Sequence, residues 1–379
     1  MYQNTTFLTN RLRQREQMGL LRQLHSGSNL VDFCSNDYLG LARSPALRQA
    51  IQQTDYQRTS VLNGATGSRL LAGHTSLADK VETQLAAFYQ TESALVFNSG
   101  YDANIGLLSS LPQRGDVLLT DELIHASMID GARLSYAERH RFMHNNLDHL
   151  STLLREARDQ KTPSIFVAVE SVYSMDGDMA PLAELVGLCA DYEAHLIVDE
   201  AHATGVYGIN GEGRVVELGL QDRVLARVHT FGKGLGVHGA AVVGSGLLRN
   251  YLINTARSFI YTTALPPHSL LAIQCAHEQL PILTEQRAKL HQHVVFFRDI
   301  ALQRMPTACW TDSSSPIQCL LIKGNKACRA VAARAQGAGF DVRAILSPTV
   351  PVGQERIRIC LHSFNAESEI AGLIDTLAS

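Results

Sequence analysis

Asp199, Lys233 and His125 carry side chains capable of acid–base or nucleophilic chemistry, and each ends a short apolar run or follows one closely. Gly100 and Tyr101 follow a further apolar run, where a helical pattern begins. The carboxyl ends of parallel strands meet at one edge of a sheet, where such sheets bind their ligands. We therefore expect these five residues to lie together if the apolar runs form one parallel sheet.

A carboxylate, a lysine and a histidine beside the start of a helix match the needs of pyridoxal phosphate (PLP). This cofactor is an electron sink that a lysine holds as a Schiff base, with an acidic partner on its ring nitrogen. Asp199 would keep that nitrogen protonated, because a nearby opposite charge favours the charged form. Lys233 would supply the amine that acts as nucleophile and base, and backbone N–H groups of Gly100 and Tyr101 could bind the phosphate. Taken singly, a glycine-flanked lysine is usually a surface turn and an aspartate at a strand end is usually a cap, so PLP is one interpretation among others.

The elements that would position these residues can be read from the apolar pattern. Runs rich in Val, Leu and Ile, with little polar alternation, predict strands buried on both faces. They span 94–97, 116–120, 165–170, 195–199, 224–230 and 240–244. Helical spacing predicts helices at 76–88 and 181–192. This alternation indicates an α/β fold with a mostly parallel sheet and helices on both faces.

Changes of pattern along the chain predict three parts. Residues 1–45 form an N-terminal arm, whose apolar residues Leu8, Leu12, Met18 and Leu21 lie roughly on one side. Residues 46–280 form a large cofactor-binding domain, and residues 281–379 a smaller C-terminal α+β domain. The expected elements of the smaller domain are a helix at 283–302, an apolar run at 317–322, a helix at 327–337, Val342, and an apolar run at 356–361.

Composition narrows the class of protein. The chain has 379 residues, and its 33 basic and 36 acidic side chains give a net charge of −3, so we expect no nucleic-acid partner. Seven cysteines without a C-x-x-C pair suggest neither a disulfide framework nor a zinc site, and fit a reducing cytoplasmic compartment. The N-terminus lacks an apolar leader, and no run of about 18 apolar residues occurs, so we expect no membrane span. The 15 histidines are scattered, and we expect no metal site.

Two motifs point to other enzyme classes, but each is incomplete. The string G-L-G-V-H-G at 234–239 resembles a dinucleotide fingerprint, yet no acidic residue to hold a ribose follows between 240 and 276. The string D-E-A-H at 199–202 is found in ATPases, but no P-loop precedes it. A dehydrogenase and an ATPase are therefore disfavoured. A non-enzymatic binding protein is the third alternative, and the presence of both Lys233 and Asp199 argues against it.

Seven motifs in the same order make the chain resemble the α-oxoamine synthases, which are PLP enzymes of fold type I. The motifs are S-N-D-Y-L-G-L at 35–41, G-A-T-G-S-R-L-L-A-G at 64–73, S-M-D-G-D at 174–178, V-D-E-A-H at 198–202, T-F-G-K-G at 230–234, Y-T-T at 261–263 and P-T-V-P at 348–351. The most similar branch condenses L-alanine with a pimeloyl thioester, carried by CoA or acyl carrier protein, in biotin synthesis. Branches that use glycine, such as glycine C-acetyltransferase (2-amino-3-oxobutyrate CoA ligase) and 5-aminolevulinate synthase, remain alternatives.

The resemblance assigns roles around the cofactor ring. Lys233 would form the Schiff base and later remove the Cα proton of alanine. Asp199 would pair with the ring nitrogen, His125 would stack on the ring, and His202 would hydrogen-bond the ring's 3′ oxygen.

The resemblance also implies residues for the phosphate and the substrates. The phosphate and its surroundings would be held by Gly100, Tyr101, Ser174 and Thr230. Thr262 and Thr263 would reach the cofactor phosphate of the neighbouring subunit, because the family's site lies at a homodimer interface. Arg358 would bind the carboxylate of the amino acid, a task that suits a guanidinium. Arg22 would meet the acyl substrate and Thr349 would line its path.

Overall fold

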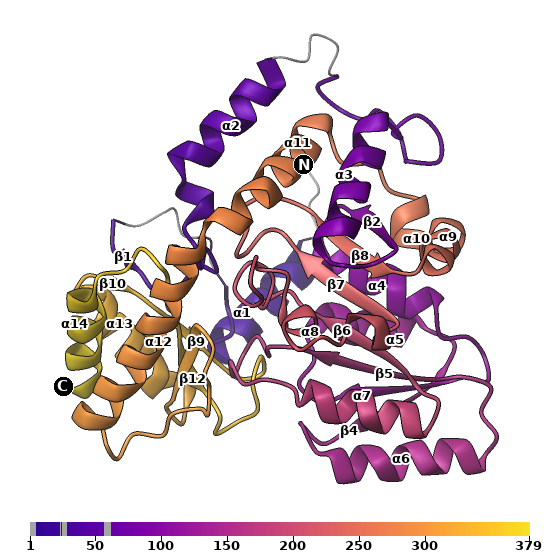
Figure 1. Ribbon diagram of the computed structural model, residues 1–379. Coiled ribbons are helices and arrows are strands. Elements are labelled where there is room, and N and C mark those ends of the chain that lie inside the picture. The colour runs from indigo at the N-terminus through magenta and orange to yellow at the C-terminus, as the bar shows by residue number, and fades with distance from the viewer. Residues whose placement is uncertain (1–4, 23, 25–28, 57–61) are drawn as a thin grey trace.

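A central sheet of seven strands, in the order β2-β8-β7-β6-β5-β3-β4, organises the larger part of the molecule (Figure 1). The computed structural model describes residues 5–22, 24, 29–56 and 62–379. The strands are β2 (Ser93–Phe97), β3 (Val117–Asp121), β4 (Glu138–Phe142), β5 (Ile165–Glu170), β6 (His195–Asp199), β7 (Ala226–Thr230) and β8 (Ala240–Gly244). Of these seven strands, β8 alone runs opposite to the other six. The prediction of a mostly parallel sheet is confirmed.

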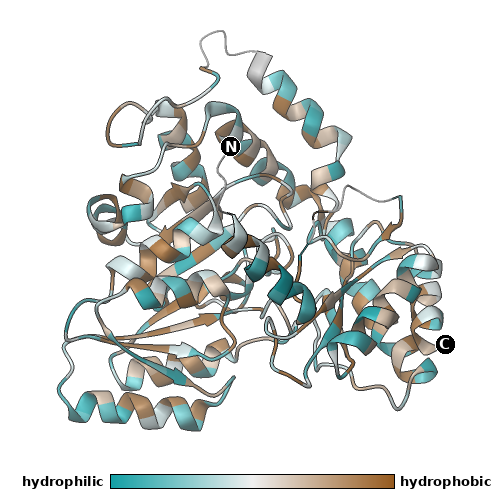
Figure 2. Ribbon diagram, turned by 180° about the vertical axis from the view of Figure 1, so that it is seen from behind, coloured by the Kyte–Doolittle hydropathy of each residue, from teal (hydrophilic) through white to brown (hydrophobic). Residues whose placement is uncertain are grey.

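Helices cover both faces of this sheet, as the alternating pattern predicted. In β2, Leu95 and Phe97 belong to one apolar core, whereas Ala94 and Val96 belong to another. Successive side chains of a strand point to opposite faces, so the two cores lie on the two sides of the sheet. Figure 2 shows the apolar strands between helices of mixed character.

Different helices pack into each core. The core with Leu95 includes α4 (Gly100–Ser110), α5 (Ala126–Leu134), α6 (Leu147–Asp159), α7 (Leu182–Asp191), α8 (Arg214–Glu217), α9 (Gly246–Thr255) and α10 (Arg257–Ile260). The core with Val96 includes α2 (Pro45–Tyr56), α3 (Ser76–Phe88) and α11 (Pro267–Gln279), and it continues into the C-terminal part of the chain.

The C-terminal part is an α+β unit built on a three-stranded antiparallel sheet. Its strands are β11 (Arg343–Ile345), β12 (Arg356–Cys360) and β9 (Ile317–Leu321), and its helices are α12 (Thr284–Arg304), α13 (Asn325–Gly337) and α14 (Glu367–Ala378). A separate short pair joins β1 (Val31–Asp32) to β10 (Phe340–Asp341) in parallel. Part of the predicted N-terminal arm thus pairs with the C-terminal unit. The division at residues 45 and 280 remains a prediction.

The arm begins with α1 (Thr6–Gln17), which has no buried side chain. Leu8, Leu12, Met18 and Leu21 are all exposed, so the described part of the chain leaves the expected apolar side of the arm uncovered. In Figure 1 this helix lies behind the rest of the chain. Arg329 of α13 donates a hydrogen bond to the backbone oxygen of Gly19, just beyond α1.

The predicted elements agree closely with the observed ones. The runs 165–170, 195–199 and 240–244 and the helix 76–88 have the observed bounds, and the other runs overlap an element, except that Val342 lies just before β11. The sequence pattern missed β4, because four of its five residues are exposed and polar and it lies at the edge of the sheet.

Candidate active site

Chemically active side chains gather at the carboxyl edge of the large sheet, as the sequence predicted. Asp199 ends β6, and Lys233 follows β7 by three residues. His125 caps the start of α5 after β3, and Gly100 opens α4 after β2.

Asp199 is held in a fixed orientation by two N–H donors. Its Oδ2 accepts from Asn104 Nδ2 at 2.7 Å, and its Oδ1 accepts from the backbone N–H of Ala201 at 2.8 Å. Asn104 Nδ2 also lies 3.0 Å from Ser127 Oγ, which is 2.7 Å from His125 Nδ1. A continuous hydrogen-bonded chain therefore links the carboxylate to the histidine that was predicted to face the cofactor.

Lys233 is half-buried next to neutral partners rather than in an ion pair. Its Nζ lies 2.8 Å from His202 Nε2, and His202 Nδ1 lies 2.7 Å from the hydroxyl of Tyr38. Burial lowers the pKa of Lys233, although the charge of Asp199 opposes this. Burial and the charge of Lys233 also hold the pKa of His202 well below its usual value. A neutral imidazole and a readily neutralised amine are what nucleophilic chemistry at Lys233 requires.

His125 is also kept neutral by its surroundings. Burial and the nearby charge of Lys233 lower its pKa, against the opposing effect of Asp199. A neutral ring can lie against an aromatic ligand without repelling a protonated nitrogen on that ligand.

The start of α4 offers backbone donors in a confined space. The N-cap Ser99 accepts from the N–H of Asp102, while the first N–H groups of a helix have no partner within it. A Cβ added at Gly100 would come within 2.1 Å of Thr230 Oγ1, so glycine is needed for Thr230 to approach the helix start. The side chain of Tyr101 points elsewhere and donates to Asp130. Only the backbone of Tyr101 therefore matches its predicted role.

Arg358 extends from β12 of the C-terminal unit and bonds neutral acceptors. Its Nε donates to the backbone oxygen of Ser174 at 2.8 Å, and its Nη2 donates to Asn36 Oδ1 at 3.0 Å. Its Nη1 lies 2.9 Å from Cys360 Sγ. Because these acceptors carry no charge, the guanidinium charge is left for an anionic ligand.

A cavity of about 300 Å³ opens beside these groups. His125 and Ser174 line it from the large sheet, and Thr349 and Pro351 line it from the C-terminal unit. Thr349 thus lines this cavity, and its place on a substrate path remains a prediction. Arg22 is exposed and makes no hydrogen bond or ion pair within the described residues, and its predicted role remains a prediction.

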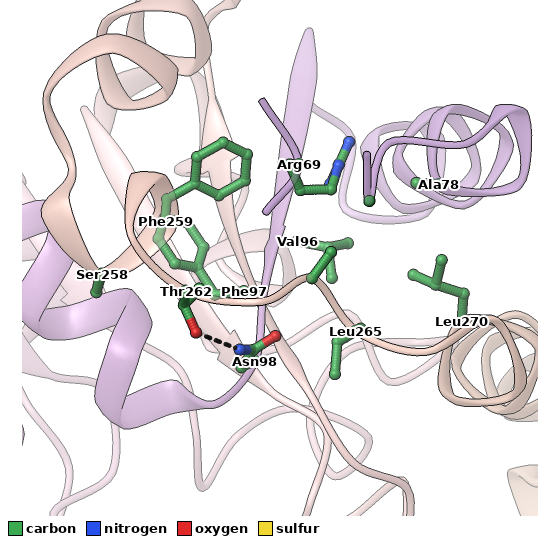
Figure 3. Close-up of a pocket in the computed structure, with 12 residues that line it drawn as sticks. Arg69, Ala78, Val96, Phe97, Asn98, Ser258, Phe259, Thr262, Leu265 and Leu270 are labelled. Atoms are coloured by element: carbon green, nitrogen blue, oxygen red, sulfur yellow. Dashed lines mark hydrogen bonds between the residues drawn. The ribbon is translucent and has the colours of Figure 1, made fainter. Parts of the chain in front are cut away.

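Thr262 and Thr263 lie close to the start of α4 in the same chain. Asn98 Nδ2 donates to Thr262 Oγ1 at 3.0 Å and to the backbone oxygen of Thr263 at 2.9 Å (Figure 3). The cavity beside Thr262 that Figure 3 shows measures only about 20 Å³, room for roughly one water molecule. The predicted contact of both threonines with a neighbouring subunit's cofactor remains a prediction.

Glu170 is a buried site residue that the sequence reading missed. It ends β5 and pairs in register with Asp199. Its carboxyl group accepts hydrogen bonds from the backbone N–H groups of His125 and Ser174, while Oε1 has no partner. Burial, together with the charge of Asp199, raises the pKa of Glu170 well above its usual value. The sequence held a signal, because the predicted strand 165–170 ends in an acid just as 195–199 does.

The residues present fit PLP. A half-buried amine (Lys233), an oriented carboxylate (Asp199) and a helix start that Thr230 approaches closely at Gly100 meet at one sheet edge. These are the groups that a Schiff-base lysine, a ring-nitrogen partner and a phosphate site require. Among the residues that the structure describes, no cluster of His, Cys, Asp or Glu could hold a metal ion. None of the described helices is both long and apolar enough to cross a membrane.

Comparison with known proteins first defines the class. Residues 28–377 match the family model of class I and II aminotransferases. Serine palmitoyltransferase from S. paucimobilis, in a structure of a variant with PLP and myriocin bound, has the same fold: the TM-score is 0.87 at 27% identity, over 98% of this chain and 96% of that one. The chain is thus a member of the PLP-dependent aminotransferase class, with fold type I.

Relatives of higher sequence identity identify the family within this class. The 8-amino-7-oxononanoate synthase of Emericella nidulans is 44% identical over 392 residues, covering 97% of this chain and 93% of that protein. The crystal structure of 8-amino-7-oxononanoate synthase from Francisella tularensis matches with a TM-score of 0.77 at 29% identity, over 92% of this chain and 97% of the other. Within the class, the chain belongs to the 8-amino-7-oxononanoate synthase family.

Proposed function

We propose that this protein condenses L-alanine with a pimeloyl thioester to give 8-amino-7-oxononanoate, carbon dioxide and free thiol, a step of biotin synthesis. The observation that carries the proposal is the hydrogen-bonded pair of Lys233 and His202 at the same sheet edge as Asp199, in a chain 44% identical to a synthase of this name. PLP, when bound, supplies an electron sink for the electron pair left at the amino acid's Cα.

Each side chain around the cofactor has a separate role in the reaction. Lys233 accepts the Cα proton of alanine and later returns a proton, for which its lowered pKa suits it. Asp199, held by Asn104 and Ala201, would pair with the ring nitrogen of the cofactor. His125 would stack on the ring, and His202, which is hydrogen-bonded to Lys233, would also hydrogen-bond the ring's 3′ oxygen.

The remaining site residues bind the ends of the substrates and the phosphate. Arg358 takes the alanine carboxylate, because its present acceptors are neutral. Thr349 lines the acyl path and Arg22 meets the acyl carrier. The phosphate residues are Gly100, Tyr101, Ser174 and Thr230, with Thr262 and Thr263 serving a neighbouring subunit.

The partners and setting follow from the same proposal. The enzyme works as a homodimer on L-alanine and on pimeloyl-CoA or pimeloyl-acyl carrier protein. Its seven cysteines without a C-x-x-C pair support a reducing, cytoplasmic setting.

Thiol release by the PLP-loaded protein tests the function. We expect L-alanine with pimeloyl-CoA to release thiol faster than glycine with acetyl-CoA or succinyl-CoA, although a single methyl group gives only about 10–200-fold discrimination. Lys233→Ala should abolish release, because no other amine is placed at the site, whereas the matched change Lys289→Ala on the exposed side of α12 should not affect it. A preference for a glycine pair would transfer the protein to another branch, and turnover by Lys233→Ala would refute the role of that lysine.

A further inference from the structure

Cys360 lies next to Arg358, the arginine proposed to bind the carboxylate, and the proposed function gives Cys360 no role. Cys360 and Arg358 are two residues apart on β12, so their side chains share one face of the strand. The thiol is fully buried, and its sulfur lies 2.9 Å from Arg358 Nη1. The same sulfur lies 3.7 Å from Asn36 Oδ1, within reach of a weak S–H donor.

Asn36 completes a ring of three side chains. Its Oδ1 accepts from Arg358 Nη2 at 3.0 Å and from the hydroxyl of Tyr38 at 3.2 Å, in addition to the thiol of Cys360. The segment after β1, which carries Asn36, is tied to β12, because the backbone N–H of Cys360 donates to the oxygen of Phe33 at 2.8 Å. The sulfur and the amide oxygen thus accept from the same edge of the guanidinium and fix its orientation.

Counting donors shows what remains for a ligand. A guanidinium has five N–H donors in one plane. Ser174 takes the Nε donor, Cys360 takes one on Nη1 and Asn36 takes one on Nη2. Because Cys360 Sγ and Asn36 Oδ1 lie only 3.7 Å apart, they take the two parallel N–H groups of Nη1 and Nη2. One outer N–H remains on each Nη, and each can donate a charge-assisted hydrogen bond to one oxygen of a carboxylate.

We propose that Cys360 is a positioning residue for the carboxylate of the amino acid: together with Asn36, its sulfur holds the guanidinium of Arg358 so that an outer N–H faces the ligand. The inference rests on the proposed function, in which Arg358 binds alanine. Burial raises the pKa of Cys360, against the effect of Arg358, so the side chain stays a thiol that can accept from Arg358 and donate to Asn36.

A merely space-filling thiol and a positioning thiol give different results in a matched pair of variants. Valine and threonine have nearly the same shape, and both suit a strand. Only Cys360→Thr keeps an atom that accepts from Nη1 and donates to Asn36. Cys189, buried in the core of α7, offers Cys189→Val as a control for the loss of a buried thiol elsewhere.

The experiment compares the four PLP-loaded proteins. The apparent Kd of L-alanine and of L-alaninamide, which lacks the carboxylate, is measured from the change in cofactor absorbance, and KM and kcat are measured by thiol release. We expect Cys360→Val to weaken L-alanine binding about five- to tenfold, as for the net loss of one hydrogen bond. We expect kcat and the affinity for L-alaninamide to stay within about twofold, and Cys360→Thr and Cys189→Val to behave like the wild type.

Two other outcomes would contradict the inference, and a third would contradict the proposed function. If Cys360→Val binds L-alanine as the wild type does, or loses both ligands equally, Cys360 only fills space and the inference is wrong. If Cys360→Thr is as impaired as Cys360→Val, hydrogen bonding by the side chain is not the cause, and the inference also fails. If the wild type itself does not respond to L-alanine, the proposed function fails instead.

Discussion

Two carboxyl groups lie side by side at the edge of the large sheet, yet their hydrogen bonding differs. Asp199 receives two N–H donors, one from Asn104 and one from the backbone of Ala201. Glu170, its register partner on β5, has an oxygen without any partner and a pKa raised well above its usual value by burial and by Asp199. Burial disfavours the charged form of a carboxyl, so Glu170 is held neutral.

The neutral state of Glu170 makes stability depend on pH in a defined direction. A carboxyl whose folded pKa is raised binds more protons in the folded state, so it costs stability as pH rises above its unfolded pKa of about 4.3. Glu170→Gln keeps the neutral form at every pH. We expect its free energy of unfolding, relative to the wild type, to increase between pH 5 and pH 8 in urea titrations. The control Glu156→Gln, on an exposed position of α6, should show no such trend, and a flat difference for Glu170→Gln would contradict a neutral Glu170.

How well single residues could be predicted depends on whether the sequence shows their position. Asp199, Lys233 and His125 follow apolar runs, and that placement alone brought them to one edge. Asn104 lies within α4, where an amide has no distinctive spacing, and Cys360 becomes visible only once β12 places it beside Arg358. Such residues act through contacts between segments far apart in the chain, which no local pattern encodes.

Among the elements, the loops after β3, β4 and β5 are fastened to one another by a single histidine. His144, two residues beyond β4, bonds Asp121 at the end of β3 through Nδ1 at 2.9 Å, and Asp178 beyond β5 through Nε2 at 2.6 Å. Burial acts against a charge here, but the two aspartates outweigh it and raise the pKa of His144 to about 10. The imidazolium therefore ties three strand ends that border the cavity.

Replacing this histidine should lower stability in a pH-dependent way. A folded pKa raised above the unfolded value of about 6.5 contributes stability that is complete below pH 6.5 and is lost as pH rises toward 10. We expect His144→Gln to lower the free energy of unfolding by about 1–3 kcal/mol at pH 6 and by much less at pH 10, as hydrogen bonds to charged groups contribute. Urea denaturation at the two pH values measures this.

His140 supplies the control on the neighbouring strand. It pairs with Glu138 on exposed β4, and exposed ion pairs contribute little. His140→Gln should change the free energy of unfolding by less than about 0.5 kcal/mol at both pH values. An equal loss for His144→Gln at pH 6 and pH 10 would show that its charge is not what binds the loops.

Element positions were predictable where burial imposes a pattern. The inner strands β5 and β6 are apolar on both faces and have the predicted bounds. The edge strand β4 has one buried residue in five and carries no such signal. The antiparallel direction of β8 was not predictable either, because apolar content does not depend on strand direction.

For the whole molecule, exposed apolar side chains on two linked loops offer a contact surface for the proposed dimer. Leu71 is 87% exposed and Tyr261 is 72% exposed, and their loops are joined by the hydrogen bond from Ala264 N to Gly67 O. Tyr261 also adjoins Thr262, which is expected to serve a neighbouring subunit. Exposed apolar patches of this kind mark protein–protein contacts.

Disrupting this surface should separate the subunits without unfolding them. We expect the wild type to sediment at twice its chain mass of 41.5 kDa, and Leu71→Glu to shift toward the single-chain mass. Leu71→Glu should keep its melting temperature but lose thiol release in dilute solution, because Thr262 and Thr263 would no longer reach a second site. Ile209→Glu, at a side chain equally exposed elsewhere, should remain dimeric. A dimeric Leu71→Glu would place the interface on another surface.

The pairing of β1 with β10 has a consequence for synthesis on the ribosome. Val31 leaves the exit tunnel among the first residues of the chain, but its partner Phe340 follows about 300 residues later, and closing so large a loop slows folding. The large sheet has all its strands by Gly244, so it can form during translation. The hydrogen bond between Arg358 and Asn36 can form only after Arg358 has been synthesised. Nascent chains would therefore assemble the PLP site of the large sheet first and the alanine carboxylate site last. A chain that stops short of β12 would have Lys233 but would lack Arg358, which binds the carboxylate of the substrate.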